Sequence, residues 1–443
     1  MHIRFPHPTR TDAVGVRAQA LRLCGILIIL LWLASCRQAE ITPTPQLAPV
    51  DPQPAVAQTP APASTTGVHS PADQRPLVVW MPSSVMPPPQ SAGGALLAQT
   101  LTEFSAAQSG QQVEVLRKAD EGQAGMVSYL RNAQQVAPAI LPDLILIDTQ
   151  HLWQVAELGL IRPLTQTQMV HREGFYNFAQ DAIMLNERRY GVPYFANVIH
   201  LAYDTRAVDT PPSTWEELLQ SGYRFTFTAG GRGGQADEWV LLHFLQSGGQ
   251  WVRGDGEQLQ PTLTMFASIE RARAEGVFPG DLMGFTTPGA VWSALLSGAT
   301  ETASVPARLY LTQRGGAPTV MPAPLPGVAE GPKTLATVYA FAILATDQQR
   351  QEWSLALIDR LLAPEVHGRW ALSESWLPTR EEAFQQWPVN DEYVGLLQDL
   401  LTTAAAPPSE RSFMELSKQL QHALSGIISG ELTPEAAAQE FAP

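Results

Sequence analysis

The segment Gly191-Val192-Pro193-Tyr194-Phe195-Ala196-Asn197-Val198-Ile199-His200-Leu201-Ala202-Tyr203-Asp204 is the one around which the chain is organised. It consists of two short extended runs with polar residues set into them. A helix signal follows, because Ser213 and Glu216 have the spacing of a capping box. We therefore predict that the chain passes here from one lobe to another, beside a ligand cleft.

The first 35 residues have the order of a secretory signal peptide. Four Arg and one Asp precede an apolar run, Leu23 to Ala34, which is shorter than the roughly 20 residues of a membrane-spanning helix. The run ends in Leu33-Ala34-Ser35-Cys36, which resembles the lipobox of bacterial lipoproteins. On this interpretation Cys36 becomes a lipidated N-terminus at the outer face of the cell membrane or in the periplasm. An ordinary signal with another cleavage site, or an uncleaved anchor, is the alternative.

Residues 36–75 are rich in Pro, Ala and Thr and have almost no large apolar side chain, so we predict a disordered tether. Loss of residues 1–35 removes four Arg and one Asp, which changes the formal charge from −14 to −17. Such an acidic chain argues against nucleic acid as a partner. Cys24 and Cys36 are the only cysteines, and the nine His are scattered without ligand spacing. We therefore expect no disulfide, no metal site and no cofactor.

Residues 76–160 alternate between strand and helix signals. The runs at 77–81, 113–116 and 143–148 are predicted strands, and the last is apolar without alternation, as in parallel sheets that are buried on both faces. This order predicts an α/β fold with a mostly parallel sheet. Further strands are expected at 224–228, 302–311, 319–321 and 335–345, and a second capping box at Thr379 and Glu382.

A succession of motifs between residues 191 and 380 resembles one family. They comprise Gly191-Val192-Pro193-Tyr194, Tyr203-Asp204, Pro212-Ser213-Thr214-Trp215-Glu216-Glu217-Leu218, Ser247-Gly248-Gly249 and Trp376-Leu377-Pro378-Thr379-Arg380. In this order they are similar to the extracellular solute-binding proteins of ABC importers, in the carbohydrate-binding cluster that includes maltose-binding protein. The resemblance covers nearly all of residues 76–443.

The resemblance implies a periplasmic-binding-protein-like fold of type II, in which two lobes are joined by hinge strands. The chain would cross between the lobes near 196–203, 321–325 and 373–378. The N-lobe would comprise 76–197 and 323–374, and the C-lobe 198–322 and 375–443. Hinge closure around a solute, followed by docking of a monomer on a membrane permease, would be the mechanism.

A sugar site needs aromatic planes and fixed hydrogen-bonding groups near strand ends. Ten residues meet this description or match family positions: Trp80, Gln150, His151, Tyr194, Asn197, Glu238, Trp239, Arg308, Tyr339 and Trp376. Trp80 could equally be a core residue, and Gln150 with His151 could be a polar pair at a helix start.

Other classes of function remain open. No Gly-x-Ser-x-Gly or His-Glu-x-x-His motif occurs, so an enzyme is not expected, although an anchored glycan hydrolase is an alternative. The glycine-rich loop 230–234 lacks the Gly-Lys-Ser/Thr ending of a phosphate-binding loop. A polyamine, amino acid or peptide could replace the sugar, and a sensor without a permease is a further alternative.

Overall fold

A computed structural model describes residues 75–169, 174–251, 258–328 and 331–441. The predicted signal peptide, the lipidated Cys36 and all of the tether except Arg75 lie outside these residues. Within the described ranges, no helix has the length and the apolar character needed to cross a membrane.

The first part of the described chain alternates strand and helix, as predicted. Its elements are β1 (Leu77–Pro82), α2 (Ala92–Ala107), β2 (Val113–Lys118), α3 (Met126–Val136), β3 (Leu144–Asp148), η2 (Thr149–His151) and α4 (Leu152–Glu157). Strand β1 pairs in parallel with both β2 and β3. The fold is therefore α/β, with helices packed against a largely parallel sheet, and the side built on β1, β2 and β3 is called the N-lobe.

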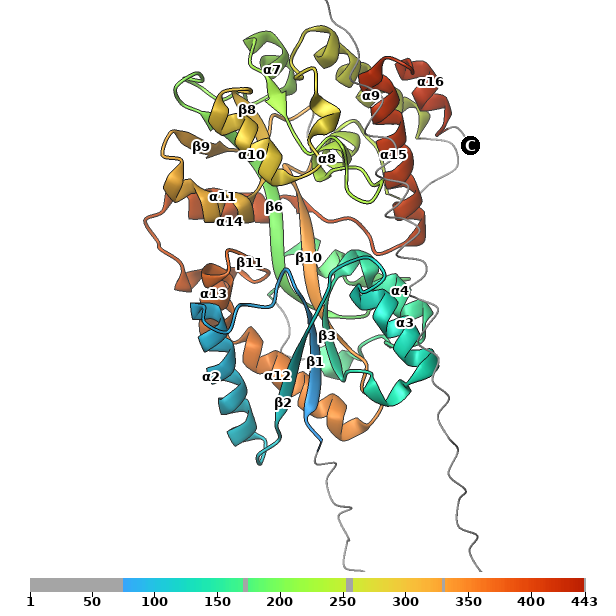
Figure 1. Ribbon diagram of the computed structural model, residues 1–443, viewed down its shortest axis with the longest axis vertical. Helices are drawn as coiled ribbons and strands as arrows, with labels where there is room; N and C mark the ends of the chain where they lie inside the picture. Colours follow the sequence, from blue (N-terminus) through green and yellow to red (C-terminus); the bar gives the residue numbers. More distant parts are fainter. Residues whose placement is uncertain (1–74, 170–173, 252–257, 329–330, 442–443) are drawn as a thin grey trace, which may run out of the picture. The chain divides into compact units, whose positions relative to one another are not determined.

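Strand β6 (Val192–Asp204) is one continuous strand of 13 residues rather than two short runs. Its N-terminal half pairs with β10 (Thr334–Ile343), and β10 pairs on its other side with β3. The C-terminal half of β6 pairs instead with β8 (Thr302–Pro306) and β9 (Val320–Ala323). Figure 1 shows β6 and β10 running side by side between the two lobes. Both strands therefore serve as hinge strands, and the side built on β8, β9 and β7 (Phe225–Thr226) is called the C-lobe.

The other two crossings lie further along the chain than we predicted. Strand β9 still pairs with the C-lobe half of β6, so the chain returns to the N-lobe along β10. Strand β11 (Leu377–Pro378) pairs with the N-lobe half of β6, and η5 (Glu381–Gln386) then packs on α13 (Pro364–Ser373) of the N-lobe. The final passage follows η5, because Asp391 already forms an ion pair with Arg314 of the C-lobe, 2.5 Å between Nη2 and Oδ2.

The C-lobe sheet is covered by helices. They comprise α7 (Trp215–Ser221), α8 (Glu238–Gln246), α9 (Leu259–Ala274), α10 (Pro288–Ser297), α11 (Ala307–Gln313), α15 (Arg411–Ser429) and α16 (Pro434–Gln439). The remaining described elements include α5 (Gln166–Met169), α6 (Asn177–Asp181), the hairpin β4 (Met184–Leu185) and β5 (Arg188–Arg189), α12 (Gln348–Leu362), α14 (Glu392–Thr402) and β12 (Ala404–Ala405).

Three local predictions were wrong. The capping box of α7 uses Thr214 and Glu217 rather than Ser213 and Glu216. The strand predicted at 302–311 stops at Pro306 and continues as α11. The second predicted capping box does not form, because Thr379 Oγ1 donates to the carbonyl of Tyr194, 3.1 Å away, and holds η5 against the hinge strand.

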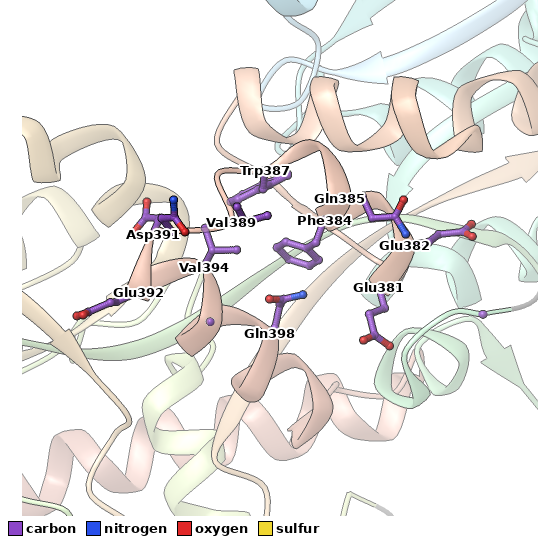
Figure 2. Close-up of a pocket in the computed structure, with 13 residues that line it drawn as sticks. Glu381, Glu382, Phe384, Gln385, Trp387, Val389, Asp391, Glu392, Val394 and Gln398 are labelled. Atoms are coloured by element: carbon purple, nitrogen blue, oxygen red, sulfur yellow. The ribbon is translucent and has the colours of Figure 1, made fainter.

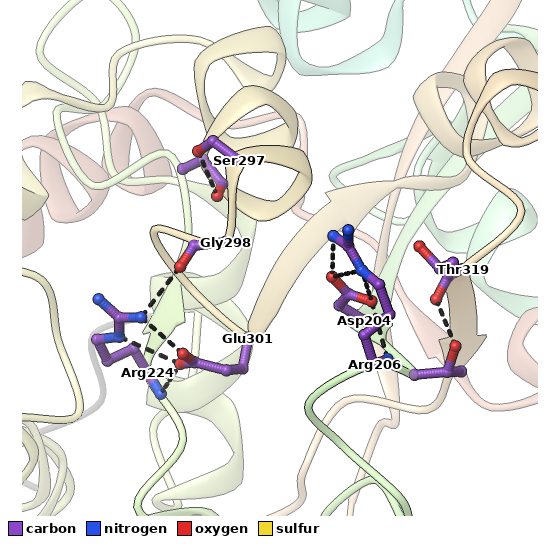
Figure 3. A network of polar contacts seen from close by, with 9 residues as sticks. Asp204, Arg206, Arg224, Ser297, Gly298, Glu301 and Thr319 are labelled. Carbon is purple, nitrogen blue, oxygen red and sulfur yellow. Dashed lines mark hydrogen bonds and ion pairs between the residues drawn. The ribbon is translucent and has the colours of Figure 1, made fainter.

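The end of β6 is fixed to the C-lobe by polar contacts (Figure 3). The guanidinium of Arg206 donates to both carboxylate oxygens of Asp204, and these hydrogen bonds are the main reason that the pKa of Asp204 lies below its usual value. Thr205 Oγ1 donates to the carbonyl of Thr319, 3.0 Å away, just before β9. The hinge strand is therefore anchored where it leaves the space between the lobes.

Candidate functional site

A small cavity of about 40 Å³ lies between the two lobes. Most of its lining comes from the N-lobe, at or just after the carboxyl ends of β1, β2 and β3, which is where open α/β sheets hold ligands. Arg232 enters from the loop between β7 and α8 of the C-lobe. The lining residues are Pro82, Asp120, Glu121, Met126, Val127, Ile147, Asp148, His151, Arg232 and Tyr339.

Hydrogen bonds between residues that follow strand ends hold the N-lobe wall of the cavity in place. Asp148 ends β3 and caps η2, since its Oδ1 accepts from the backbone N–H of Gln150, 3.0 Å away. This turn places His151 on the cavity wall. Asp120, just after β2, accepts from the hydroxyls of Ser83 and Ser84 and from the Ser84 N–H. Both carboxylates are therefore held by groups that follow strand ends, Asp120 by those after β1 and Asp148 by the one after β3.

On the C-lobe side, the glycine-rich loop contributes Arg232 to the cavity lining. Gly231, Gly233 and Gly234 have φ between +60° and +80°, so the loop can turn tightly around Arg232. Arg232 Nη2 lies 3.1 Å from Glu121 Oε1 and forms an ion pair from one lobe to the other. Further along the chain, Asp237 is the N-cap of α8, and Glu238 Oε1 accepts from Thr337 Oγ1 on β10, 3.4 Å away.

Burial controls the electrostatics of this region. It raises the pKa of Asp148; the negative charge of Glu238 adds to this effect, whereas His151, the Gln150 N–H and Arg232 oppose it. Burial also raises the pKa of Asp237 well above its usual value, again with a contribution from Glu238. The pKa of Tyr339 is raised mainly by burial as well. Buried carboxyl groups with a raised pKa thus occur in both lobes.

A second group of residues joins the lobes beside β6. The backbone N–H of Arg308, in α11, donates to Asn197 Oδ1 at 3.0 Å. The Arg308 guanidinium lies 4.2 Å from the ring centre of Trp376. The rings of Trp376 and Tyr339 are packed edge to face, with 5.1 Å between their centres. Because Tyr339 also lines the cavity, this aromatic group and the cavity are continuous.

The structure brings together several of the residues that the sequence predicted. His151 and Tyr339 line the cavity, Gln150 precedes His151 in η2, and Glu238 lies close enough to affect Asp148. Asn197, Arg308 and Trp376 form the adjoining group.

Three predicted residues lie in cores instead. Trp80 is 1% exposed, and its ring packs against Tyr129 and the Lys118 ammonium. Tyr194 is fully buried and stacks on His367. Trp239 is 2% exposed within the C-lobe core. The prediction that these three rings lie in the ligand cleft was therefore wrong, because sequence pattern alone does not show on which side of a strand or helix a ring packs.

The sequence analysis did not single out Asp120, Glu121, Asp148 or Arg232. A usable signal existed for the acidic residues, since Asp120 and Glu121 directly follow one predicted strand and Asp148 ends another. Parallel strands carry such residues to one edge of a sheet. Arg232 gave no such signal, because its role depends on the approach of the opposite lobe.

Two larger hollows share no lining residue with the interlobe cavity. One, of about 810 Å³, is formed mainly by η5 and the start of α14, and includes Phe384, Trp387 and the exposed Val389 (Figure 2). The other, of about 770 Å³, adjoins it through residues 390–392. The second hollow includes β9 and Pro324. We place the candidate site in the interlobe cavity, because its lining combines the carboxyl ends of β1 and β3 with a residue of the opposite lobe. Within the described ranges, no group of three or more His, Cys, Asp and Glu side chains could hold a metal ion.

Comparison with known proteins agrees with this geometry. The family described as "Bacterial extracellular solute-binding protein" matches residues 99–393. No curated protein sequence matches the chain.

Solved structures of similar fold include a maltose-bound MalE3 of T. maritima, with 17% identity, 82% of this chain and 97% of that chain covered, and a TM-score of 0.63. The sugar-binding protein MalE of Xanthomonas citri is 17% identical; the match covers 83% of this chain and 95% of that chain, with a TM-score of 0.67. The GacH receptor of Streptomyces glaucescens has 16% identity, 82% and 96% coverage, and a TM-score of 0.64. At these identities the likeness shows the fold.

Proposed function

The chain belongs to the bacterial extracellular solute-binding proteins, and from this we propose that it is the substrate-binding lipoprotein of an ABC importer. In this proposal a sugar or oligosaccharide binds between the lobes, the lobes close around it, and the closed protein delivers it to the permease. Family membership implies an extracytoplasmic location.

The observation that carries the proposal is a cavity with walls from both lobes, which are connected by continuous strands. The ion pair between Arg232 and Glu121 and the contact of Arg308 with Trp376 each join one lobe to the other. A solute that contacts both walls stabilises the closed arrangement by the difference in its affinity for the two states. Hinge closure is a common switching mode for such two-lobe proteins.

The size of the cavity supports a moving hinge. Its volume of about 40 Å³ has room for only a few water molecules, since one water needs about 10–15 Å³ of such space. A sugar ring is far larger, so binding requires the lobes to separate from the arrangement described. The long strands β6 and β10 provide the connection about which they can do so.

The choice of a carbohydrate rests on the side chains and on the similar structures. Trp376 and Tyr339 present rings next to hydrogen-bonding groups, which suits the apolar faces and hydroxyl rims of sugars. Maltose is the ligand named for the T. maritima protein, and acarbose is named for the S. glaucescens receptor. The proposal transfers that class of ligand, and no particular sugar, to this chain.

Small-angle scattering tests the proposal directly. We expect the radius of gyration to change when the protein is saturated with maltotriose or with another oligosaccharide that a thermal-shift screen of sugars, polyamines and amino acids identifies. An unchanged radius at saturation would contradict hinge closure. A screen in which sugars give no shift while amino acids or peptides do would contradict the ligand class.

The anchor and the absence of catalysis need separate tests. Replacement Cys36→Ser is expected to move the protein from the membrane fraction to the soluble fraction, whereas Cys24→Ser, inside the signal, leaves it at the membrane. Incubation with the bound oligosaccharide is expected to return it uncut. Release of shorter products would favour a hydrolase instead.

A further inference from the structure

We propose that the N-lobe rests on the outer face of the cell membrane through residues 136–140, which are called the apolar patch. The partner is a lipid surface, at the boundary between headgroups and acyl chains. This inference rests on the lipid anchor of the proposed function and adds a second contact to it. Stable attachment to a bilayer commonly combines an acyl anchor with a further contact.

The apolar patch is exposed. It joins the end of α3 to β3 and includes the short helix η1 (Pro138–Ile140). The side chains of Val136 and Ile140 are 85% and 50% exposed, and Pro138 and Ala139 between them are exposed as well. Single exposed apolar residues are common on soluble proteins. Here four of them occur within five residues and form one surface.

The apolar patch also lies in a stretch without charge. None of the nine residues from Gln134 to Pro142 is charged, although the chain has a formal net charge of −14. Gln134 Nε2 donates to the carbonyl of Leu158, 2.7 Å away, so the end of α4 lies beside the patch. An uncharged surface is the part of an acidic protein that approaches anionic headgroups with the least repulsion.

The tether reaches the N-lobe at the same edge of the sheet. Arg350 Nη2 donates to the Pro76 carbonyl at 2.7 Å and to Asp143 Oδ2 at 2.5 Å. The Val78 N–H donates to the same carboxylate oxygen, 2.8 Å away. Because Asp143 follows the apolar patch by three residues, these contacts place the start of β1 close to the patch. An anchor that pulls on the tether therefore brings the patch toward the membrane.

This edge is opposite the candidate ligand site. Strands β1 and β3 run in parallel from it to the interlobe cavity. Figure 1 shows the start of β1 at the end of the N-lobe that lies farthest from the C-lobe. With the apolar patch on the bilayer, the cavity faces the medium from which a solute arrives.

A weak contact is sufficient because the anchor keeps the apolar patch near the membrane. A tether of residues 36–75 reaches at most on the order of 100 Å. Binding of a second site on an already attached molecule is intramolecular and has a high effective concentration. A patch too small to bind membranes from solution is therefore occupied in the anchored protein, and it still releases the domain when a permease binds.

The test places one fluorescent probe at a time on the mature chain. Cys24 and Cys36 are the only cysteines, so a chain that begins at residue 37 with a histidine tag has no other thiol. Phosphatidylcholine vesicles with a nickel-chelating lipid hold this tag, so the result does not depend on lipidation. A polarity-sensitive dye is attached at Val136→Cys, at Ile140→Cys or, as a matched control, at Val389→Cys, whose native side chain is 87% exposed.

We expect attachment to the vesicles to raise the fluorescence at 136 and 140 about twofold, because the dye enters the less polar boundary of the bilayer. A lipid-borne quencher should reverse this rise, and the dye at 389 should not respond. In the chain labelled at 140, Val136→Gln removes apolar surface and should reduce the rise by about half. Val389→Gln should leave it unchanged, and thermal unfolding checks that both variants are folded.

Each outcome decides. No rise at 136 and 140, or an equal rise at 389, overturns the membrane contact. A rise that follows protein concentration without vesicles shows that a second copy covers the apolar patch, and it also overturns the contact. If the probes respond but Cys36→Ser leaves the native protein in the membrane fraction, the contact is supported and the lipid anchor is overturned. If Cys36→Ser releases the protein and the probes do not respond, the membrane contact alone fails.

Discussion

Trp239 and Trp376 are exposed by only 2% and 4%, yet their neighbours come from different places. The ring centre of Trp239 lies 4.2 Å from that of Phe227 and 4.9 Å from that of His243, on which it stacks, and both partners belong to the C-lobe. Trp376, reached from the N-lobe, lies under Arg308 of the C-lobe and against Tyr339 at the cavity. Low exposure is therefore common to a core position and to a wall between lobes, and the origin of the neighbours distinguishes them.

The largest expected effect is on stability at the core position. Trp239→Ala removes a ring enclosed by other aromatic side chains, and we expect a loss of about 3–5 kcal/mol in the free energy of unfolding, measured by urea denaturation. The sequence analysis had instead named Trp239 among the candidate ligand-binding residues. A loss below about 1 kcal/mol would place Trp239 on the ligand wall after all.

The histidine beside Trp239 makes the same core sensitive to acid. Burial lowers the pKa of His243 to about 3, whereas an unfolded histidine titrates near 6.5. The unfolded chain therefore binds more protons between these values, so this contribution to stability is complete above pH 6.5 and is lost as the pH falls. From pH 7 to pH 5 we expect His243→Gln to lose about 2 kcal/mol less stability than the wild type. Equal losses in urea unfolding at the two pH values would contradict this.

The matched replacements Trp376→Phe and Trp239→Phe test the same difference between the two positions with a smaller loss of packing than replacement by Ala. Trp376→Phe removes the indole N–H and weakens the stacking with Arg308, so we expect affinity for a bound oligosaccharide to fall by about 1 kcal/mol, or roughly fivefold. Trp239→Phe should reduce stability and leave affinity unchanged. Calorimetry measures the affinity of both variants, and urea unfolding measures their stability. Similar losses of affinity in the two variants would contradict the distinction between the two tryptophan positions.

The smallest effect is expected for the exposed contact between the lobes. The side chains of Arg232 and Glu121 are 75% and 51% exposed, and ion pairs in such settings contribute about 1 kcal/mol or less. A double-mutant cycle with Arg232→Gln and Glu121→Gln should therefore give a small coupling energy that decreases with added salt. A coupling above about 2 kcal/mol would show that this pair, rather than the Trp376 group, holds the lobes together.

The sequence alone was sufficient for the class of fold. The apolar run that forms β3, the β6 segment and the alternation of strands with helices predicted a two-lobe α/β protein, because these signals depend on neighbours in the chain. It also predicted a ligand site at strand ends, and two of the residues that it named, His151 and Tyr339, line the interlobe cavity; where a ligand binds stays a prediction.

Errors arose where a distant residue competes for a local group. Thr379 was expected to cap a helix, but its hydroxyl donates to the Tyr194 carbonyl on β6. Tyr194 was expected in the cleft, but its hydroxyl donates to the Leu361 carbonyl, 3.2 Å away, within the N-lobe core. In both cases a contact between residues far apart in the chain replaces the arrangement that the local sequence pattern predicted.

The alternation of strands and helices, the acidic charge and the order of motifs that resembles the family could be predicted from the sequence, since each depends on composition or on short spacing. The tertiary structure decided which side chains meet. It surrounded Trp239 with rings of the C-lobe, placed Arg308 of the C-lobe over the ring of Trp376, and brought Arg232 to Glu121. Those outcomes depend on how two lobes approach across β6 and β10, and no spacing along the chain encodes that approach.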